Sequence, residues 1–163
     1  MATNKRSRIA FEDVRLGFRN FSGKEGKFNP AGRRNFCIFI PPERLEDILE
    51  DGWNVKFLKP RDENEEPVPY IQVAVNFDNY PPQIILISSS GKTFLDEESV
   101  DILDWAEIEC ADVIVTGYDW EVNGSSGRKA YLKAIYVTLV EDEFASKYAN
   151  VPDSAATAIM TEE

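Results

Sequence analysis

The chain has 163 residues, of which 43% are hydrophobic, and its 18 lysines and arginines stand against 29 aspartates and glutamates for a formal net charge of −11. This length and apolar content suit one folded domain with a buried core and argue against a wholly disordered chain. The absence of histidine excludes Ser-His-Asp and Cys-His nucleophile systems, histidine-based acid–base catalysis and histidine-ligated metal sites.

The first 36 residues carry a charge opposite to that of the whole chain. They hold nine cations against three anions, a net of +6, so the remaining 127 residues carry −17. Cations gathered within an acidic chain are typical of a local anion-binding surface on a body that otherwise repels itself. The total charge therefore does not exclude nucleic acid as a partner.

Alternating and β-branched apolar residues predict a chain made mainly of strands. A short helix is expected to begin at Pro41-Pro42 and to end near Gly52, and a helical turn is expected over residues 97–105. The Asn-Gly pair at residues 123–124 predicts a hairpin between the last two strands. In chain order, the strands are expected over residues 8–21 (with a bend at Gly17), 33–40, 53–57, 71–77, 84–87, 108–120 and 128–140.

These elements favour a mainly β fold, because no βαβ alternation and no repeat occurs. Five or more strands with turn-rich connections and one or two short helices predict a small β-barrel, closed or partly open, since closure removes exposed sheet edges. The domain is expected over residues 1–145, and a flexible acidic C-terminal tail over residues 146–163.

The two cysteines and the N-terminus bear on the compartment. Cys37 and Cys110 lie among apolar residues and are expected to be reduced thiols that serve as small core groups, with one disulfide as the alternative. No apolar signal-peptide core follows the basic N-terminus, and no apolar run approaches the ~20 residues of a membrane span. We therefore expect a soluble, cytoplasmic protein without membrane contact.

Cations and aromatic residues alternate in the N-terminal quarter, as single-stranded nucleic acid requires. Cations hold phosphates, and aromatic faces stack with bases at ~1–3 kcal/mol per base. In the alternative reading the phenylalanines are core residues and the cations are merely solvated. The alternating run ends at Phe36, and the residues in it that we expect to bind nucleic acid are Arg15, Phe18, Arg19, Phe21, Lys24, Lys27, Phe28, Arg33 and Arg34.

Two further patches combine cations with aromatic side chains. Their aromatics could equally pack within the sheet, as cross-strand pairs do. The first patch contains Lys56, Phe57, Lys59, Arg61 and Tyr70, and the second contains Tyr118, Trp120, Arg128, Lys129, Tyr131 and Lys133. Of these, we expect Lys56, Phe57, Lys59, Trp120, Lys129 and Tyr131 to bind nucleic acid.

Two patterns could indicate catalysis. The Gly91-Lys92-Thr93 run resembles the end of a phosphate loop, but Leu86 stands where its first glycine belongs, so a turn is expected there. Grouped carboxylates could hold Mg²⁺ or Mn²⁺ in a nuclease, although a solvated face explains them equally simply. These acids are Asp101, Asp104, Glu107, Glu109 and Asp112. We expect no catalytic residue, no cofactor and no metal site.

Most of the chain, from about residue 8 to 145, resembles a family of bacteriophage single-stranded DNA-binding proteins. The likeness lies in the segments FEDVRLGFRNFSGKEGKFNPAGRRNF, GWNVKFLKPRDENEEP, LDWAEIECADVIVTGYDWEVNG and KAYLKAIYVTL. It implies an OB-like barrel that binds single-stranded DNA without catalysis in phage replication or recombination, with proteins of those processes as further partners. Proteins of this class often end in an acidic tail closed by an aromatic residue, whereas this chain ends Ala-Ile-Met-Thr-Glu-Glu.

The sequence thus predicts a non-enzymatic, largely sequence-independent single-stranded DNA-binding protein, whose oligomeric state it leaves open. The alternative is an acidic protein-interaction module, or a DNA mimic that inhibits a host DNA enzyme. The cationic N-terminal segment argues against a mimic, because a mimic needs anions throughout its contact surface.

Overall fold

The computed structural model describes residues 6–27, 29–78, 80–145 and 147–152, which form nine strands and three short helical segments. The strands are β1 (Arg6–Val14), β2 (Leu16–Asn20), β3 (Arg34–Phe39), β4 (Lys56–Leu58), β5 (Val68–Val75), β6 (Gln83–Ser88), β7 (Gly91–Leu95), β8 (Ile108–Val122) and β9 (Ser125–Leu139). The helical segments are η1 (Pro42–Arg44), α1 (Leu45–Glu50) and η2 (Val100–Asp104). The prediction of a mainly β chain is confirmed.

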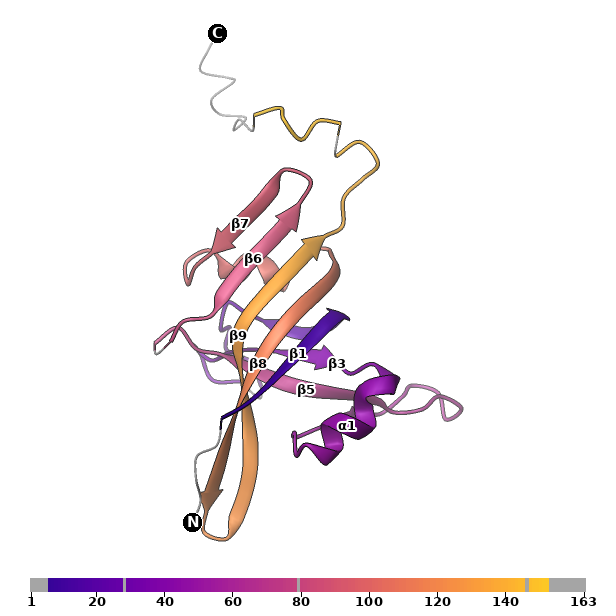
Figure 1. Cartoon of the computed structure of the whole chain (residues 1–163), viewed down its shortest axis with the longest axis vertical. Helices are drawn as coiled ribbons and strands as arrows, with labels where there is room; N and C mark the ends of the chain where they lie inside the picture. The colour runs from indigo at the N-terminus through magenta and orange to yellow at the C-terminus, as the bar shows by residue number, and fades with distance from the viewer. Residues whose placement is uncertain (1–5, 28, 79, 146, 153–163) are drawn as a thin grey trace.

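The nine strands form one hydrogen-bonded sheet. Its main order is β1-β8-β9-β5-β3-β2, with β4 paired to β5 and the β6–β7 hairpin attached to β9. The β8–β9 hairpin runs along the length of the molecule, and β3 and β5 cross it (Figure 1). Within the described residues no ladder joins the terminal strands β1 and β2, so the sheet curves without closing.

The predicted Asn-Gly turn is confirmed. Asn123 and Gly124 both take left-handed φ values, 49° and 81°, as a two-residue hairpin turn requires. The turn joins strands of 15 residues each. Each of these strands is therefore longer than the strand predicted for it.

Three predicted elements are wrong in detail. The strand over residues 8–21 is two strands, since β1 ends at Val14 and pairs with β8, whereas β2 begins at Leu16 and pairs with β3. The Gly91-Lys92-Thr93 segment was expected in a turn but begins β7, and the turn is one step earlier, at Ser89 and Ser90. Trp53 precedes β4 as a buried residue instead of beginning a strand.

A single apolar core lies inside the curve of the sheet. It takes every second side chain of β3 and β5, such as Phe36 and Ile38 or Ile71 and Val73, as expected where a sheet buries one face. Phe21 joins them, because its ring stacks on Phe36 at a centroid distance of 4.9 Å and has no exposed surface. None of the three helical segments described here has the length or the apolar character of a membrane span.

Both cysteines are free thiols, as predicted. Cys37 is buried, and this burial raises its pKa to about 11 despite the opposing charge of Lys56. Cys110 is only half-buried, so it is less of a core group than expected; desolvation is the main cause that raises its pKa as well. Both thiols therefore stay protonated at neutral pH.

Candidate nucleic-acid interface

Among the nine strands, only β1 and β8 contain aspartate or glutamate. The strands β2, β3, β4, β5 and β9, which adjoin one another, contain none. In a chain with a net charge of −11, this distribution leaves one region of the sheet cationic. The cations on these strands are Arg19, Arg34, Lys56, Arg128, Lys129 and Lys133.

Strand pairing brings several of these side chains to one surface, the outer face. In β5, Ile71 and Val73 point into the core, so Gln72 and Ala74 point outward. Residues paired across strands share a face, and Ala74 pairs with Asn35 of β3 and with Tyr131 of β9. By this alternation the part of the outer face around β5 includes Asn35, Cys37, Phe39, Lys56, Tyr70, Gln72, Ala74, Asn76, Thr116, Tyr118, Trp120, Lys129, Tyr131 and Lys133.

A pocket of about 260 Å³, here called the basic pocket, is lined by outer-face residues such as Gln72 and Lys129 and also by inward-facing residues such as Ile71 and Ala130. None of the described residues that line it is acidic, and three amide side chains supply further hydrogen-bonding groups. Such a lining suits phosphate oxygens, which accept hydrogen bonds from cations and amides. The lining residues are Arg33, Arg34, Asn35, Trp53, Asn54, Lys56, Ile71, Gln72, Ala74, Trp120, Arg128, Lys129 and Ala130.

The five cations of the basic pocket fall into two groups. Arg34 pairs with Glu97 at 3.6 Å, and Arg128 pairs with Asp119 and Asp51. Arg33, Lys56 and Lys129 form no ion pair within the described part of the chain. The charge of these three residues is therefore available to a ligand.

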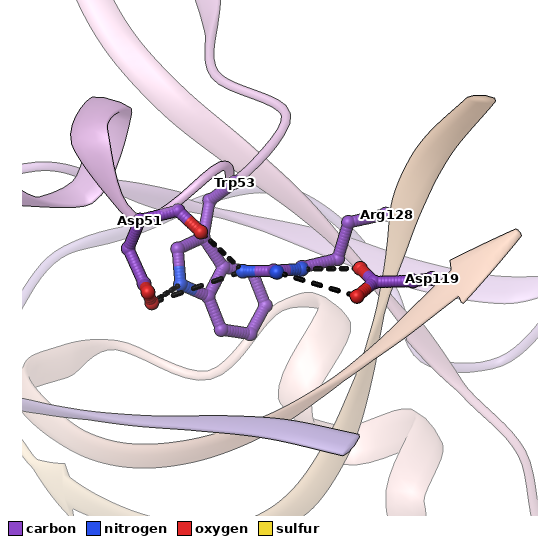
Figure 2. A network of polar contacts seen from close by, with 4 residues as sticks. All are labelled: Asp51, Trp53, Asp119 and Arg128. Carbon is purple, nitrogen blue, oxygen red and sulfur yellow. Dashed lines mark hydrogen bonds and ion pairs between the residues drawn. The ribbon is translucent and has the colours of Figure 1, made fainter. Parts of the chain in front are cut away.

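Arg128, which lines the basic pocket, is the centre of a network of polar contacts (Figure 2). Its Nε donates to Asp119 Oδ1 at 2.6 Å, and its Nη1 donates to the Asp51 carbonyl oxygen at 2.6 Å. The guanidinium lies 5.0 Å from the centroid of Trp53, whose Nε1 donates to Asp51 Oδ2 at 2.8 Å. Gly117 leaves room for this arrangement, since a Cβ there would lie 2.7 Å from Arg128 Cδ. The network ties the β8–β9 hairpin to the end of α1.

Asp119→Asn is expected to lower the free energy of unfolding at neutral pH, by an amount that shrinks in acid. The hydrogen bond from Arg128 is the main cause that lowers the pKa of Asp119; desolvation opposes it, and the positive charge of Arg128 adds to the lowering. A lowered folded-state pKa gives stability that is present above the unfolded-state value of about 4 and is lost as pH falls through the folded value. Urea unfolding of wild type and variant at pH 7, 5 and 3 should show their difference shrinking at pH 3, and a constant difference would contradict this role.

A second pocket, here called the tyrosine pocket, lies beside the basic pocket. It encloses about 380 Å³. Tyr118 meets Tyr131 edge to face at 6.2 Å, and the Lys129 ammonium lies 5.4 Å from the Tyr131 centroid, which links the two pockets. The tyrosine pocket is lined by Asn76, Tyr80, Thr116, Tyr118, Tyr131, Leu132 and Lys133.

The structure brings six of the predicted site residues together. Arg33, Arg34, Lys56, Trp120 and Lys129 line the basic pocket, and Tyr131 lines the tyrosine pocket. The Trp120 ring is 46% exposed and packs over Gly127, where a Cβ would lie 2.8 Å from it.

Sequence reasoning did not propose Asn35, Trp53, Asn54, Gln72, Ala74 and Tyr80, which line these pockets. The alternation of β5 could have indicated Gln72 and Ala74, because they are the outward residues of a strand without acids. Trp53 and Tyr80 offered no such signal, since neither lies in a strand.

Two predicted residues have structural roles instead. Phe21 is buried against Phe36 and offers no ring face to a base. Arg19 Nη1 donates to the carbonyl oxygens of Leu103 and Ala106 at 2.9 and 2.7 Å, which anchors β2 to η2 and the residues after it. Neither is part of the interface that we propose below.

The other predicted residues lie outside both pockets. Phe18 is exposed on β2 and is considered further below. Lys24 and Lys27 are exposed in the loop between β2 and β3, and Arg15 is exposed between β1 and β2. The exposed residues Phe57 and Lys59 lie on β4 and just after it. Phe28 lies outside the described residues.

The acid cluster includes a structural carboxylate. Asp104 accepts hydrogen bonds from the backbone N–H groups of Phe21 and Ser22 and from the Ser22 hydroxyl. It therefore holds the end of β2 against η2. No group of three cysteine, aspartate or glutamate side chains in the described residues is arranged to hold a metal ion.

Solved structures show where this fold occurs. The single-stranded DNA-binding protein from bacteriophage Enc34, as a C-terminal truncation, has a TM-score of 0.57 and 9% identity, with 83% of this chain and 87% of that chain covered. A second structure of the Enc34 protein has a TM-score of 0.56 and 10% identity, covering 93% and 89%. A third, in complex with single-stranded DNA, has a TM-score of 0.52 and 10% identity, covering 84% and 89%. At such identities the similarity establishes a shared fold.

Sequence comparison supplies the family. No curated protein sequence matches the chain. A family model described as a putative phage ssDNA-binding domain matches residues 1–163. Because this match spans the whole sequence, the chain belongs to the family of phage single-stranded DNA-binding domains.

Proposed function

We propose that the chain binds single-stranded DNA on its outer face, with phosphates in the basic pocket and bases on the aromatic rings beside it. Arg33, Lys56 and Lys129 would hold the phosphates, and Trp120 and Tyr131 would stack with bases. The observation that carries the proposal is a pocket with five cations and no acid in a chain of net charge −11. Family membership supports the same ligand.

The arrangement favours a single strand over a duplex. A base offers its face to an aromatic ring only when it is unstacked from its neighbours, and each such contact is worth ~1–3 kcal/mol. We interpret the curved, open sheet as an OB-like barrel, a fold that binds single strands on one face and its flanking loops. Because phosphates and base faces are common to all sequences, binding should be largely sequence-independent.

The test is fluorescence anisotropy of a labelled oligothymidylate at several salt concentrations. Three neutralised phosphates predict that log K falls with log salt at a slope of about −2, from roughly −0.7 per phosphate. A duplex of the same length should bind more weakly. A flat salt dependence, or equal affinity for the duplex, would contradict the proposal.

Trp120→Ala is expected to weaken binding of an oligothymidylate by about 5- to 150-fold, the range that loss of one base–aromatic stack gives. The matched control is Trp105→Ala, because Trp105 is 70% exposed but lies outside both pockets. Anisotropy titrations of both variants should show the loss in Trp120→Ala alone. If Trp120→Ala and Trp105→Ala bound with equal affinity, Trp120 would not be part of the interface.

We propose that this role is non-catalytic and belongs to phage DNA replication or recombination. The acid-free strands of the outer face weigh against the alternative of a DNA mimic, whose contact surface needs anions. The proposed domain boundary near residue 145 and the acidic tail over residues 146–163 stay predictions, since residues 146 and 153–163 lie outside the described part.

A further inference from the structure

Phe18 has an unusual backbone conformation for an exposed aromatic residue. Its φ is +46°, in the left-handed region that bulky side chains rarely adopt, and its side chain is 58% exposed. Strained residues that persist in a fold gather at ligand-binding sites, so an observed strain of this kind justifies asking what the side chain does. No packing into the core explains it.

The strain turns the Phe18 ring onto the outer face. The β2–β3 register shifts between Gly17 and Asn20, and a bulge of this kind re-aims a side chain. The ring then lies 5.9 Å from Tyr70 and 6.5 Å from Phe39, measured between centroids. Gly17 permits this, because a Cβ there would lie 2.5 Å from the Phe39 ring. Phe18, Phe39 and Tyr70 form what we call the aromatic triad.

The aromatic triad, the basic pocket and the tyrosine pocket lie in a line along β5. Its outward residues are Tyr70 in the triad, Gln72 and Ala74 in the basic pocket and, just beyond its end, Asn76 in the tyrosine pocket. Lys56 connects the first two, since it pairs with Tyr70 in the ladder and its Nζ donates to Gln72 Oε1 at 3.2 Å. The six residue steps from Tyr70 to Asn76 span about 20 Å of extended chain.

We propose that the aromatic triad is a second base-stacking site, so that one strand of DNA runs along β5 from the tyrosine pocket across the basic pocket to Phe18. Aromatic rings at both ends of a row of cations match what a single strand offers, bases on either side of a run of phosphates. The inference rests on the proposed function. It adds the direction in which the strand lies on the protein and the length of the site.

The test uses Phe18→Gly, because glycine accepts the left-handed φ and loses only the ring. The matched control is Phe94→Gly, since Phe94 is 70% exposed on β7 and lies outside both pockets and the aromatic triad. The probes are oligothymidylates of 4 and 12 nucleotides, lengths at the lower end and within the range of site sizes for OB folds. Circular dichroism and a thermal melt establish that both variants are folded.

Phe18→Gly is expected to weaken binding of the 12-mer by about 5- to 150-fold and to leave binding of the 4-mer unchanged, because the 4-mer can occupy the two pockets alone. Phe94→Gly should leave both affinities unchanged. Phe18→Leu should fail to restore the 12-mer affinity, since it keeps apolar packing but has no π face. An unchanged 12-mer affinity in Phe18→Gly, or full rescue by leucine, would overturn the second stacking site.

A second readout separates this inference from the proposed function. An oligonucleotide with 2-aminopurine at one end should lose its fluorescence quenching in Phe18→Gly, whereas the same base at the other end should stay quenched on the tyrosine pocket. Equal quenching of both ends in the variant and in wild type would overturn the triad alone. Failure of wild type to bind either oligonucleotide would overturn the proposed function itself.

Discussion

Reversing Lys56 and Lys129 together, as Lys56→Glu and Lys129→Glu, is expected to weaken binding of single-stranded DNA by at least about 100-fold. Each lysine lines the basic pocket without an ion pair in the described residues, so each can donate a charged hydrogen bond worth ~1.5–3 kcal/mol to a phosphate. The loss of two phosphate contacts should also make the slope of log K against log salt less negative by about 1.4. Anisotropy titrations at several salt concentrations measure both effects.

The matched control is Lys92→Glu with Lys147→Glu. These exposed lysines lie on β7 and beyond β9, outside both pockets. Each reversal subtracts two charges, so both double variants go from −11 to −15 and differ only in where the charge changes. If the two variants lost affinity equally, long-range charge would govern binding and the basic pocket would not be the phosphate site.

Phe21→Ala is expected to lower the free energy of unfolding by ~3–5 kcal/mol, the usual result of removing a buried phenylalanine. The ring has no exposed surface and stacks on Phe36, so its loss leaves a cavity in the core. Urea denaturation followed by circular dichroism measures the change. A domain of this size has a stability of ~5–15 kcal/mol, so the variant should stay folded at low temperature.

The folded Phe21→Ala protein should bind oligothymidylate as wild type does, because Phe21 touches neither pocket. This is the opposite of the behaviour expected for Trp120→Ala, which should lose affinity with little change in stability. Phe21→Leu, with a smaller cavity, provides a second folded variant. If Phe21→Leu lost affinity for oligothymidylate without losing stability, Phe21 would be part of the interface after all.

Local patterns predicted much of the fold. The Asn-Gly pair at residues 123–124 required a tight turn, and the alternation around it specified the long β8–β9 hairpin. The sequence did not predict β7. Serine and glycine in the Ser-Ser-Ser-Gly run indicate a turn, but they do not tell whether a second strand follows that turn.

The phenylalanines of the N-terminal quarter show the limit of pattern. Phe18 and Phe21 belong to the same cluster of cations and aromatics, yet one is exposed and the other is buried. The difference comes from the left-handed φ at Phe18 and the register shift beside it, which change which face each ring takes. No spacing in the sequence encodes that shift.

The sequence alone determined that a chain of net charge −11 keeps a cationic segment, with +6 in its first 36 residues, and therefore pointed to an anionic ligand. Only the tertiary structure decided which cations lie together. Arg33, Lys56 and Lys129 are far apart along the chain, and the pairing of β3, β4, β5 and β9 brings them to one pocket. Strand pairing joins residues that are distant in the sequence. The attraction of an anionic ligand depends on how close the cations lie in space and not on their distance along the chain.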